Sequence, residues 1–474
     1  MRLLFEKSIP GRKSAYLPPC DVPQAELPEA LRRKIPLGLP ELSEGDVARH
    51  YSALEMRTFG VNDGFYPLGS CTMKYNPAIN ETVAALPGFA DIHPLAGDRH
   101  TQGMLEAIHL AERYFCELSG MDAMSFQPSA GAQGELLGMM LIKKYHEDRG
   151  DAARRNVFIP DSAHGTNPAT VGMCGWKVVN LPSNAEGRID VEKLRALAGP
   201  ETAGIMLTNP NTLGIFEKDV VEVTKIVHEA GGLCYYDGAN LNPIAGVAKP
   251  GEMGFDCVHL NLHKTFSTPH GGGGPGSGPV GCKAFLAQYL PGLRPQKIAG
   301  GYEARATRAA RSLHLFHGNA LVYLRALVYV ATLGADGLLE MSSQATLNAN
   351  YLMKRLRERF EIVNKGRCMH EFVITMEKEA KKGVSAKDMA KAFLDNGMMA
   401  PTMYFPLIVK EALMVEPTET EGKETLDEVA DTFIRLYDAL LADPESARDY
   451  PRNTVIGRPD EVEAARNPRL RYLG

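Results

Sequence analysis

The chain has 474 residues, which is more than a single hydrophobic core usually supports, so two or three structural units are expected. Its content of 44% hydrophobic and 23% charged residues is typical of a soluble globular protein. The formal net charge of -5 at pH 7 argues against a nucleic-acid binder, because such proteins need a basic face to displace counterions.

Membrane and disulfide-linked classes are also disfavoured. No stretch approaches the roughly 18 to 20 uninterrupted apolar residues of a membrane span. The eight cysteines are scattered and none forms a C-x-x-C pair, which argues against a zinc ribbon or a redox pair. Dispersed cysteines in a long chain are usually reduced, so a cytoplasmic location is expected.

The first part of the chain, residues 1–95, is predicted to be an arm and a linker. Proline is frequent up to about residue 60, which prevents long helices. A disordered leader would have the same prolines, but apolar side chains such as Leu4, Phe5 and Ile9 favour an arm that docks on another surface.

Residues 96–340 are predicted to form a large domain in which helices alternate with short apolar runs. This alternation indicates βαβ units and a mainly parallel sheet, whose ligands bind at the carboxyl ends of the strands. Helices are expected at 102–119, 134–147 and 220–229, and strands at 156–159, 177–181, 204–207, 233–236 and 257–260.

Residues 341–474 are predicted to form a smaller α+β domain. Helical patterns at 344–359, 386–396 and 423–442 surround strand-like runs at 371–376 and 412–415.

The most informative motif follows the last strand of the large domain. Lys264 comes directly after an apolar run and is followed by glycines at 271–274. A lysine at the carboxyl edge of a sheet can point into the ligand crevice and form an internal aldimine with an aldehyde cofactor. A solvated lysine at a strand end is the simpler interpretation, but other residues support the catalytic one.

An acid lies upstream of this lysine, also at a strand end. Asp237 follows the run 233–236. A pyridine ring is the best electron sink when its nitrogen stays protonated, and a buried aspartate supplies that partner. Helix capping or magnesium binding would explain the same residue without a cofactor.

A phosphate site is predicted where the helix near residue 134 begins. Small residues before a helix let backbone N–H groups and the positive helix end meet a phosphate. The candidate binding residues there are Ser129, Gly131, Ala132 and Gln133.

Two further strand ends offer polar side chains. His164 follows the run 156–159, which suits a flat ring stacked on the cofactor, although a structural histidine is the default. Asn209 follows the run 204–207 and offers an amide for the phenolic oxygen. The G-x-G-x-x-G match at 276–281 follows no strand and opens no helix, so NAD binding is rejected.

Together these residues resemble the pyridoxal-phosphate subunit of glycine dehydrogenase (decarboxylating), the P-protein family of the glycine cleavage system. The similarity runs from about residue 50 to 440, and the His-Lys-Thr-Phe block with its four glycines is highly specific. The matching stretches are 67–74, 163–169, 237–242, 260–276, 347–351, 400–403 and 413–419.

The resemblance implies an aminotransferase-like (type I) fold, with a large seven-stranded sheet domain and a small carboxyl-terminal domain. It is a resemblance to the carboxyl half of the long enzyme, which implies subunit 2 of the two-chain form, assembled with subunit 1 as a heterotetramer of two copies of each. The implied reaction decarboxylates glycine and transfers the aminomethyl group to the lipoyl arm of the H-protein. Lys264, Asp237 and His164 would be catalytic, and Ala239, His263 and Thr265 would also contact pyridoxal 5'-phosphate.

Substrate and partner contacts are less sharply defined by the sequence. Ser70, Cys71 and Lys74 are candidates for binding glycine, although a solvated loop would look the same. A basic set could meet an acidic lipoyl carrier, or could be a solvated face: Arg294, Lys297, Arg305, Arg308 and Arg311. Another decarboxylase or aminotransferase of this fold would keep the cofactor residues, whereas a non-catalytic structural partner would not need Lys264 and Asp237.

Overall fold

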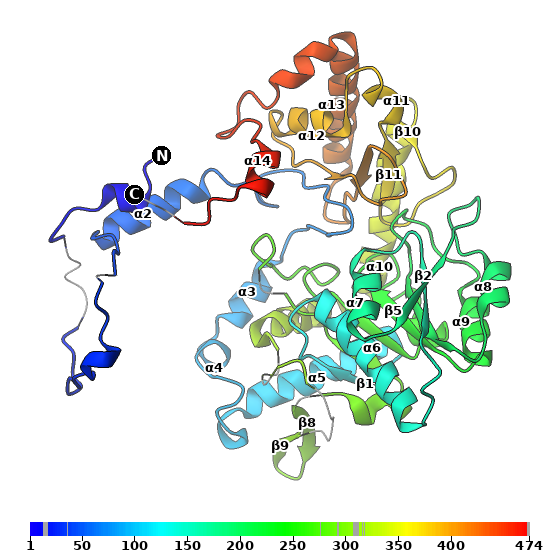
Figure 1. The fold of residues 1–474 in the computed structure, drawn as a ribbon, viewed down its shortest axis with the longest axis horizontal. Coiled ribbons are helices and arrows are strands. Elements are labelled where there is room, and N and C mark those ends of the chain that lie inside the picture. Colours follow the sequence, from blue (N-terminus) through cyan, green and yellow to red (C-terminus); the bar gives the residue numbers. More distant parts are fainter. Residues whose placement is uncertain are drawn as a thin grey trace. The chain divides into compact units, whose positions relative to one another are not determined.

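The computed structural model describes residues 1–12, 18–35, 37–274, 276–291, 293–306, 312–314, 316 and 318–471. The chain forms two compact units (Figure 1). The larger is Gly64–Arg452, and the smaller combines Met1–Asp63 with Asn453–Gly474.

A seven-stranded sheet forms the centre of the larger unit, and its strand order is β1-β7-β6-β5-β4-β2-β3. Neighbouring strands from β3 to β6 are parallel, and only β7 is antiparallel to its neighbours. This confirms the mainly parallel seven-stranded sheet. The strands are β1 Ala123–Ser125, β2 Asn156–Pro160, β3 Lys177–Leu181, β4 Thr202–Thr208, β5 Leu233–Gly238, β6 Cys257–Leu260 and β7 Val280–Cys282.

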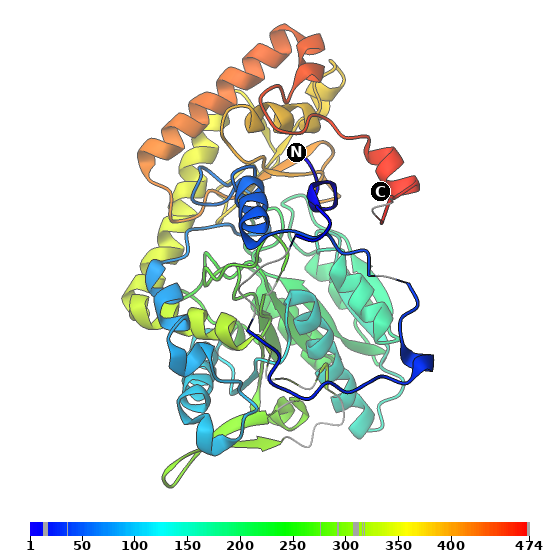
Figure 2. The same ribbon diagram turned by 90° about the vertical axis from the view of Figure 1, so that its left-hand side faces the viewer.

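Both faces of this sheet are covered by helices, which explains why its central strands β4, β5 and β6 are buried along their whole length. Alternate side chains of a strand point to opposite faces. Helices lie on both faces of the sheet (Figure 2). The core on one face joins Tyr236 to residues of α5, α9 and α10, and the core on the other face joins Tyr235 to residues of α6 and α7. The helices are α5 Gln102–Ser119, α6 Gly131–Asp148, α7 Thr166–Met173, α8 Val191–Leu197, α9 Val220–Glu229 and α10 Ala320–Leu356.

The predicted elements of this region are present with small shifts. Helix α5 ends at the predicted residue because Gly120 adopts the left-handed conformation that closes a helix. Helix α6 begins at Gly131, earlier than predicted, since Ala130 is extended and serves as its N-cap. Helix α10 begins well before the predicted residue 344.

Helix α10 is long and apolar enough to cross a membrane by length and composition alone. Gly334, with φ 63° and ψ -169°, interrupts the helix, and Tyr323 and Leu324 are buried in the core beside the sheet. Arg325 forms an ion pair with Glu81 of α3, Ala78–Ala84. These contacts identify α10 as a core helix.

A second, four-stranded sheet lies in the carboxyl-terminal part of the larger unit, with the order β10-β11-β13-β12. It packs with α12, α13 and the end of α10 around a separate core. The boundary expected at residues 340/341 falls inside α10. The elements are β10 Glu361–Ile362, β11 Phe372–Thr375, α11 Glu377–Ala380, α12 Ala386–Leu394, β12 Thr402–Met403, β13 Ala412–Val415 and α13 Lys423–Ala442.

The smaller unit contains few helices and leaves much apolar surface in water. Leu31, Ile35 and Leu39 are 70%, 76% and 68% exposed. Its longest helix, α2, begins at a capping box formed by Ser43 and Asp46. The remaining elements are α1 Leu4–Lys7, α2 Glu44–Glu55 and α14 Glu461–Arg466 in this unit, and α4 Pro87–Ala90, β8 Leu293–Ile298 and β9 Gly301–Ala306 in the larger one.

Candidate active site

Polar side chains meet in a cavity of about 180 Å³ at the carboxyl ends of the parallel strands. Asp237 is the penultimate residue of β5, and Lys264 lies shortly after the end of β6. The strand order makes β5 and β6 direct neighbours, so these two side chains reach the same crevice. The lining residues are Ser70, Gly131, Ala132, Glu135, His164, Thr166, Thr208, Thr212, Asp237, Ala239, Asn240, His259, Asn261, His263 and Lys264.

Lys264 is half-buried, and its amine has a single hydrogen-bond partner among the contacts described. Its Nζ donates to the carbonyl oxygen of Ser70 at 2.6 Å. The neighbouring His263 accepts a hydrogen bond from the Ser277 N–H at 3.2 Å. Burial, and then the charge of Lys264, lower the pKa of His263 to about 3, so its ring is neutral. The amine is thus oriented by a neutral backbone carbonyl and is not bound in an ion pair in the described contacts.

Asp237 is buried and held by neutral donors. Its Oδ1 accepts from the Ala239 N–H at 3.0 Å, and its Oδ2 accepts from the Thr208 hydroxyl at 3.2 Å. The Nε2 of His259 lies 3.6 Å from Oδ1. Because the Tyr235 hydroxyl lies 2.5 Å from the other ring nitrogen of His259, we assign the proton to Nε2, where it faces Asp237.

A second carboxyl group, Glu135, lines the same cavity. Burial, and then the charge of Asp237, raise its pKa to about 8. The Thr166 hydroxyl donates to its Oε1 at 2.7 Å. Turned so that its nitrogen faces the carboxyl groups, the Asn167 amide donates to Glu135 at 3.0 Å and to Asp237 at 3.3 Å. A neutral Glu135 therefore adds no second negative charge beside Asp237.

The amino terminus of α6 opens onto the cavity through Gly131 and Ala132. Among the residues that the structure describes, no side chain caps this helix end, so the N–H groups of its first turn are available to a ligand. A Cβ at Gly131 would lie only 2.5 Å from the Asn261 Oδ1, which explains the need for glycine there. Ser129 and Gln133 bond each other instead, from the Ser129 N–H to the Gln133 Oε1 at 2.9 Å, and do not line the cavity.

His164 lies at the rim of the cavity, partly exposed, with its Nδ1 2.9 Å from the Thr166 hydroxyl. Partial burial lowers its pKa. Phe405 lies beside the ring, with centroids 5.4 Å apart. A neutral flat ring in this position can stack on a planar ligand in the cavity.

Two predicted residues are buried behind the cavity wall. The Asn209 Oδ1 accepts from the Glu217 N–H at 2.9 Å, while its Nδ2 has no hydrogen-bond partner in the described part of the chain. Thr265 is buried, and its hydroxyl likewise finds no partner there. Ala239 and His263, in contrast, line the cavity.

The three candidates for substrate binding are separated by the fold. Ser70 lines the cavity, and Cys71 is half-buried, with its thiol pKa raised by burial. Lys74 is buried and is not among the residues that line the cavity. Its Nζ lies 2.7 Å from Glu419 and 3.2 Å from the Tyr329 hydroxyl, in a pair whose side chains are 1% and 9% exposed. A buried ammonium needs a charged partner, which Glu419 supplies, and the Tyr329 hydroxyl places the amine beside α10.

Sequence reasoning did not single out several cavity residues, among them Glu135, Asn240 and His259. Glu135 lies one helical turn after Gly131, which places it over the same helix end. His259 lies in β6 at an apolar position, where a polar residue is unusual. The helical spacing of Glu135 and the polar residue in β6 were therefore the sequence signals that could have pointed to these two cavity residues.

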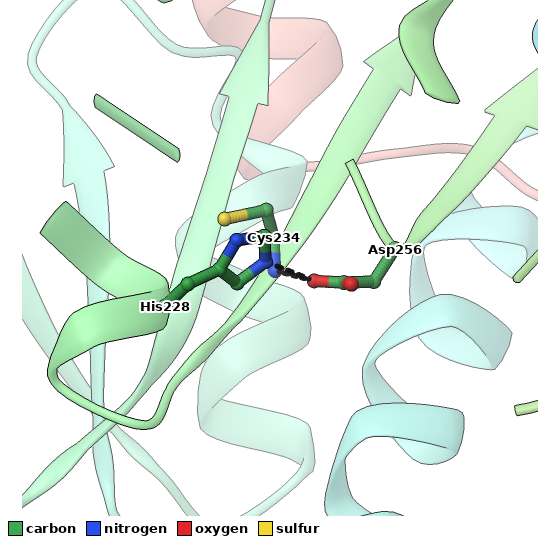
Figure 3. A group of neighbouring side chains, drawn as sticks. All are labelled: His228, Cys234 and Asp256. Atoms are coloured by element: carbon green, nitrogen blue, oxygen red, sulfur yellow. Dashed lines mark hydrogen bonds and ion pairs between the residues drawn. The ribbon is translucent and has the colours of Figure 1, made fainter. Parts of the chain in front are cut away.

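A second polar cluster joins α9 to the opposite end of β5 and contains His228, Cys234 and Asp256 (Figure 3). One oxygen of Asp256 accepts from the Cys234 N–H at 2.7 Å and lies 2.8 Å from the His228 Nε2. Its hydrogen bond with Asp256 raises the pKa of His228, and burial keeps Cys234 a thiol by raising its pKa well above the usual value. These contacts explain the cluster as a structural link between α9 and β5.

The donor set of the cavity fits pyridoxal phosphate: an uncapped helix end for a phosphate, a buried aspartate for a ring nitrogen, an amine for an aldehyde and a flat ring at the rim. The sheet with this arrangement defines the class as the type I fold of pyridoxal-phosphate enzymes. The fold is similar to that of a glycine decarboxylase (P-protein) crystallised with an inhibitor, at a TM-score of 0.74 and 22% identity over 86% of this chain and 93% of that one. The fold is also similar to that of a cysteine desulfurase from Escherichia coli, with a TM-score of 0.63 and 17% identity over 81% of this chain and 98% of that one.

The sequence comparisons define the family more closely. The probable glycine dehydrogenase (decarboxylating) subunit 2 of Treponema denticola is 53% identical over 99% of this chain and 98% of its own length. The protein of the same name from Listeria monocytogenes serotype 4b is 50% identical over 100% of this chain and 98% of its own length. Residues 341–457 match the family model described as glycine dehydrogenase, C-terminal domain. The chain belongs to the family of glycine dehydrogenase (decarboxylating) subunit 2 and is an enzyme.

Proposed function

We propose that this chain is the pyridoxal-phosphate-carrying subunit that decarboxylates glycine and transfers the remaining aminomethyl group to the lipoyl arm of the H-protein. The amine of Lys264 carries the proposal, because it lies in a cavity with Asp237 at the carboxyl edge of a type I sheet. The names of the relatives support glycine as the substrate.

The residues of the cavity would hold the cofactor at three points. The N–H groups at the start of α6 would bind its phosphate, Asp237 would bind its ring nitrogen and Lys264 would bond its aldehyde carbon. When bound, pyridoxal phosphate supplies an electron sink for the pair of electrons released as carbon dioxide leaves.

The protein side chains then control protons and water. Asp237 would keep a proton on the ring nitrogen, since the Thr208 hydroxyl and the Ala239 N–H hold its carboxyl group in place. Ser70 orients the Lys264 amine through its carbonyl oxygen, so the amine stays within reach of the reacting carbon. His164 would cover the ring at the cavity rim and limit the access of water.

A partner subunit fits the exposed apolar surface of the smaller unit. Leu31, Ile35 and Leu39 are exposed there, and a partner that buries them would gain about 25 cal/mol per Å² of apolar surface. The name of the relatives, subunit 2, supports a subunit 1 as this partner, and we propose a heterotetramer of two copies of each in the cytoplasm.

The proposed contact with the H-protein involves the β8–β9 hairpin. Lys297 and Arg305 are exposed there, whereas Arg294 already pairs with Glu112 and Arg305 with Glu303. The other two residues of the predicted basic set, Arg308 and Arg311, lie outside the described residues. These pairings reduce the free positive charge, so Lys297 is the best remaining candidate on the hairpin.

The deciding experiment is exchange of labelled carbon dioxide into glycine. The chain coexpressed with subunit 1 should catalyse this exchange when pyridoxal phosphate and lipoylated H-protein are supplied, and the chain alone should be poorly active. Full exchange by the lone chain would refute the two-chain proposal. Exchange that requires another amino acid would identify a different decarboxylase of the same fold.

A further inference from the structure

Two buried glutamates meet at one end of the carboxyl-terminal sheet. Glu371 immediately precedes β11 and Glu416 immediately follows β13. Phe372 pairs with Val415 in this antiparallel ladder, so the two glutamates are the next cross-strand neighbours. They are 0% and 1% exposed. Like charges opposite each other destabilise a sheet, so this arrangement needs a functional explanation.

Both glutamates bind the loop that touches Lys264. The Ser70 N–H donates to the Glu371 Oε2 at 2.8 Å, and the Thr72 hydroxyl donates to the Glu416 Oε1 at 2.6 Å. The carbonyl of the same Ser70 accepts from the Lys264 Nζ at 2.6 Å. A continuous chain of hydrogen bonds therefore runs from Glu371 through Ser70 to the amine.

The conformation of the loop depends on these contacts. Ser70 has a φ of 64°, a left-handed conformation that is unfavourable for a residue with a side chain. The preceding Gly69 is pressed against Met414, since a Cβ would lie 2.3 Å from that side chain. Such a conformation persists only where the surroundings hold it, and Glu371 supplies the acceptor that does so.

We propose that Glu371 and Glu416 are positioning residues that hold the Ser70–Thr72 loop against Lys264. Neither glutamate lines the cavity, so both act through the loop and not on the substrate. The proposal rests on the proposed function, in which the Lys264 amine is the reacting group.

The two carboxyl groups differ in what surrounds them, although burial raises the pKa of both. Burial, and then the charge of Glu416, raise the pKa of Glu371 well above its usual value. Burial also raises the pKa of Glu416 to about 7, but hydrogen bonds from Thr72 and Asn242 oppose this rise. The titratable groups that face the pair are Lys264, Glu419, Cys71, Cys368 and His370.

His370 offers a competing interpretation, because its Nε2 lies 3.9 Å from Glu371 and 4.0 Å from Glu416. Neither ring nitrogen of His370 has a hydrogen-bond partner in the described residues, and a divalent cation could bind all three side chains. Two observations favour the positioning role instead. Neutral donors occupy the Glu371 Oε2 and the Glu416 Oε1, the two oxygens that face the His370 Nε2, and the positive Lys264 acts on all three groups.

The first test measures the loop in the cofactor-free, full-length chain by hydrogen exchange of the peptide that contains Ser70. Glu371→Ala removes the acceptor and should accelerate this exchange. Glu371→Gln keeps an oxygen and a neutral group and should change it much less. Glu379→Ala is the matched control, because Glu379 is also a buried glutamate (8% exposed) but bonds Tyr437 instead of the loop. Unaltered exchange in Glu371→Ala would overturn the proposal.

The second test uses the chain assembled with its partner. Glu371→Ala should lower kcat by up to about 100-fold with little change in KM, because a displaced amine loses its reacting geometry. Glu371→Gln should lose much less, and Glu416→Gln should lose the pH dependence near 7 that Glu416 contributes. Equal losses in the alanine and glutamine variants of Glu371 would show that a neutral acceptor at this position does not hold the loop, and this result would overturn the proposed positioning role.

Two additions keep the outcomes distinguishable. If Glu371→Ala does not fold, Thr72→Val removes the loop side of the Glu416 contact and should accelerate the same exchange. Metal analysis after gel filtration should find no stoichiometric divalent ion, and one such ion per chain, lost in Glu416→Gln, would replace the proposal with a metal site. The hydrogen-exchange result does not depend on glycine chemistry, so it stands even if the proposed function fails.

Discussion

An aspartate beside a histidine occurs at both ends of strands β5 and β6, and the two pairs have opposite properties. At the carboxyl end, His259 lies 3.6 Å from Asp237, and its Nε2 has no hydrogen bond within the described residues. At the amino end, His228 lies 2.8 Å from Asp256, whose same oxygen also accepts from Cys234. Burial lowers the pKa of His259, whereas the hydrogen bond raises that of His228.

The difference shows that residue type alone does not define a reactive site. The pair at the amino end is satisfied internally and stabilises the contact between α9 and β5. The pair at the carboxyl end adjoins a cavity, a free helix end and a lysine, so its polar groups remain available to a ligand.

Of all the changes, replacing Lys264 should cause the largest loss of activity at the carboxyl end of the sheet. Lys264→Ala removes the amine that would bond the cofactor, so activity should fall to the background rate. Borohydride reduction and peptide mapping of the unaltered chain should place the cofactor on Lys264. A label on another lysine would contradict the assignment.

The two aspartates give the most direct contrast between the two ends. Asp237→Asn should retain cofactor but lower the decarboxylation rate by about 10²- to 10⁴-fold, because an amide cannot keep the ring nitrogen protonated. Asp256→Asn should leave the rate nearly unchanged and lower the free energy of unfolding by about 1–3 kcal/mol. Exchange kinetics and chemical denaturation of both variants measure these effects, and similar rates for the two would remove Asp237 from its role.

His164 tests whether the rim of the cavity needs a proton or only a flat ring. His164→Phe keeps a flat ring, so it should bind cofactor and lose roughly tenfold activity or less, because even the complete loss of stacking would cost only about 0.5–1.5 kcal/mol. The absorbance of the bound cofactor and the exchange rate check this result. Complete loss of chemistry with the cofactor still bound would instead indicate proton transfer by His164.

Glu135 provides the smallest effect, and it concerns stability. In the folded chain its pKa is raised to about 8, so between an unfolded pKa of about 4.3 and this value only the folded state holds the proton. The free energy of unfolding should therefore fall as pH rises through this range. Glu135→Gln should remove this slope and make the cofactor-free chain relatively more stable at pH 8, by on the order of 1–3 kcal/mol.

Denaturant unfolding at pH 5 and pH 8 measures the slope for Glu135→Gln and for the exposed control Glu192→Gln. Identical slopes in the parent, the variant and the control would show that Glu135 is ionised throughout.

Much of the larger unit could be predicted because its elements have local signals. Alternation of apolar runs with helical patterns predicted the parallel sheet, and Gly120 marked the end of α5. The strand ends then predicted Asp237, His164 and Lys264 as neighbours, and the structure places all three on one cavity.

The remaining features depend on contacts between distant segments, which local patterns do not contain. Lys74 is directed away from the cavity by Glu419, and Glu371 reaches Ser70 from another sheet. The early start of α10 was missed because its first half is apolar on most sides, as expected of a helix buried in a core.

The position of β7 has a consequence for synthesis on the ribosome. Strand β7 lies between β1 and β6, so β1 has no place in the sheet until residues 280–282 have emerged. A nascent chain that stops before Val280 would therefore contain Lys264 and Asp237 but expose an incomplete sheet edge, the species that chaperones would need to protect.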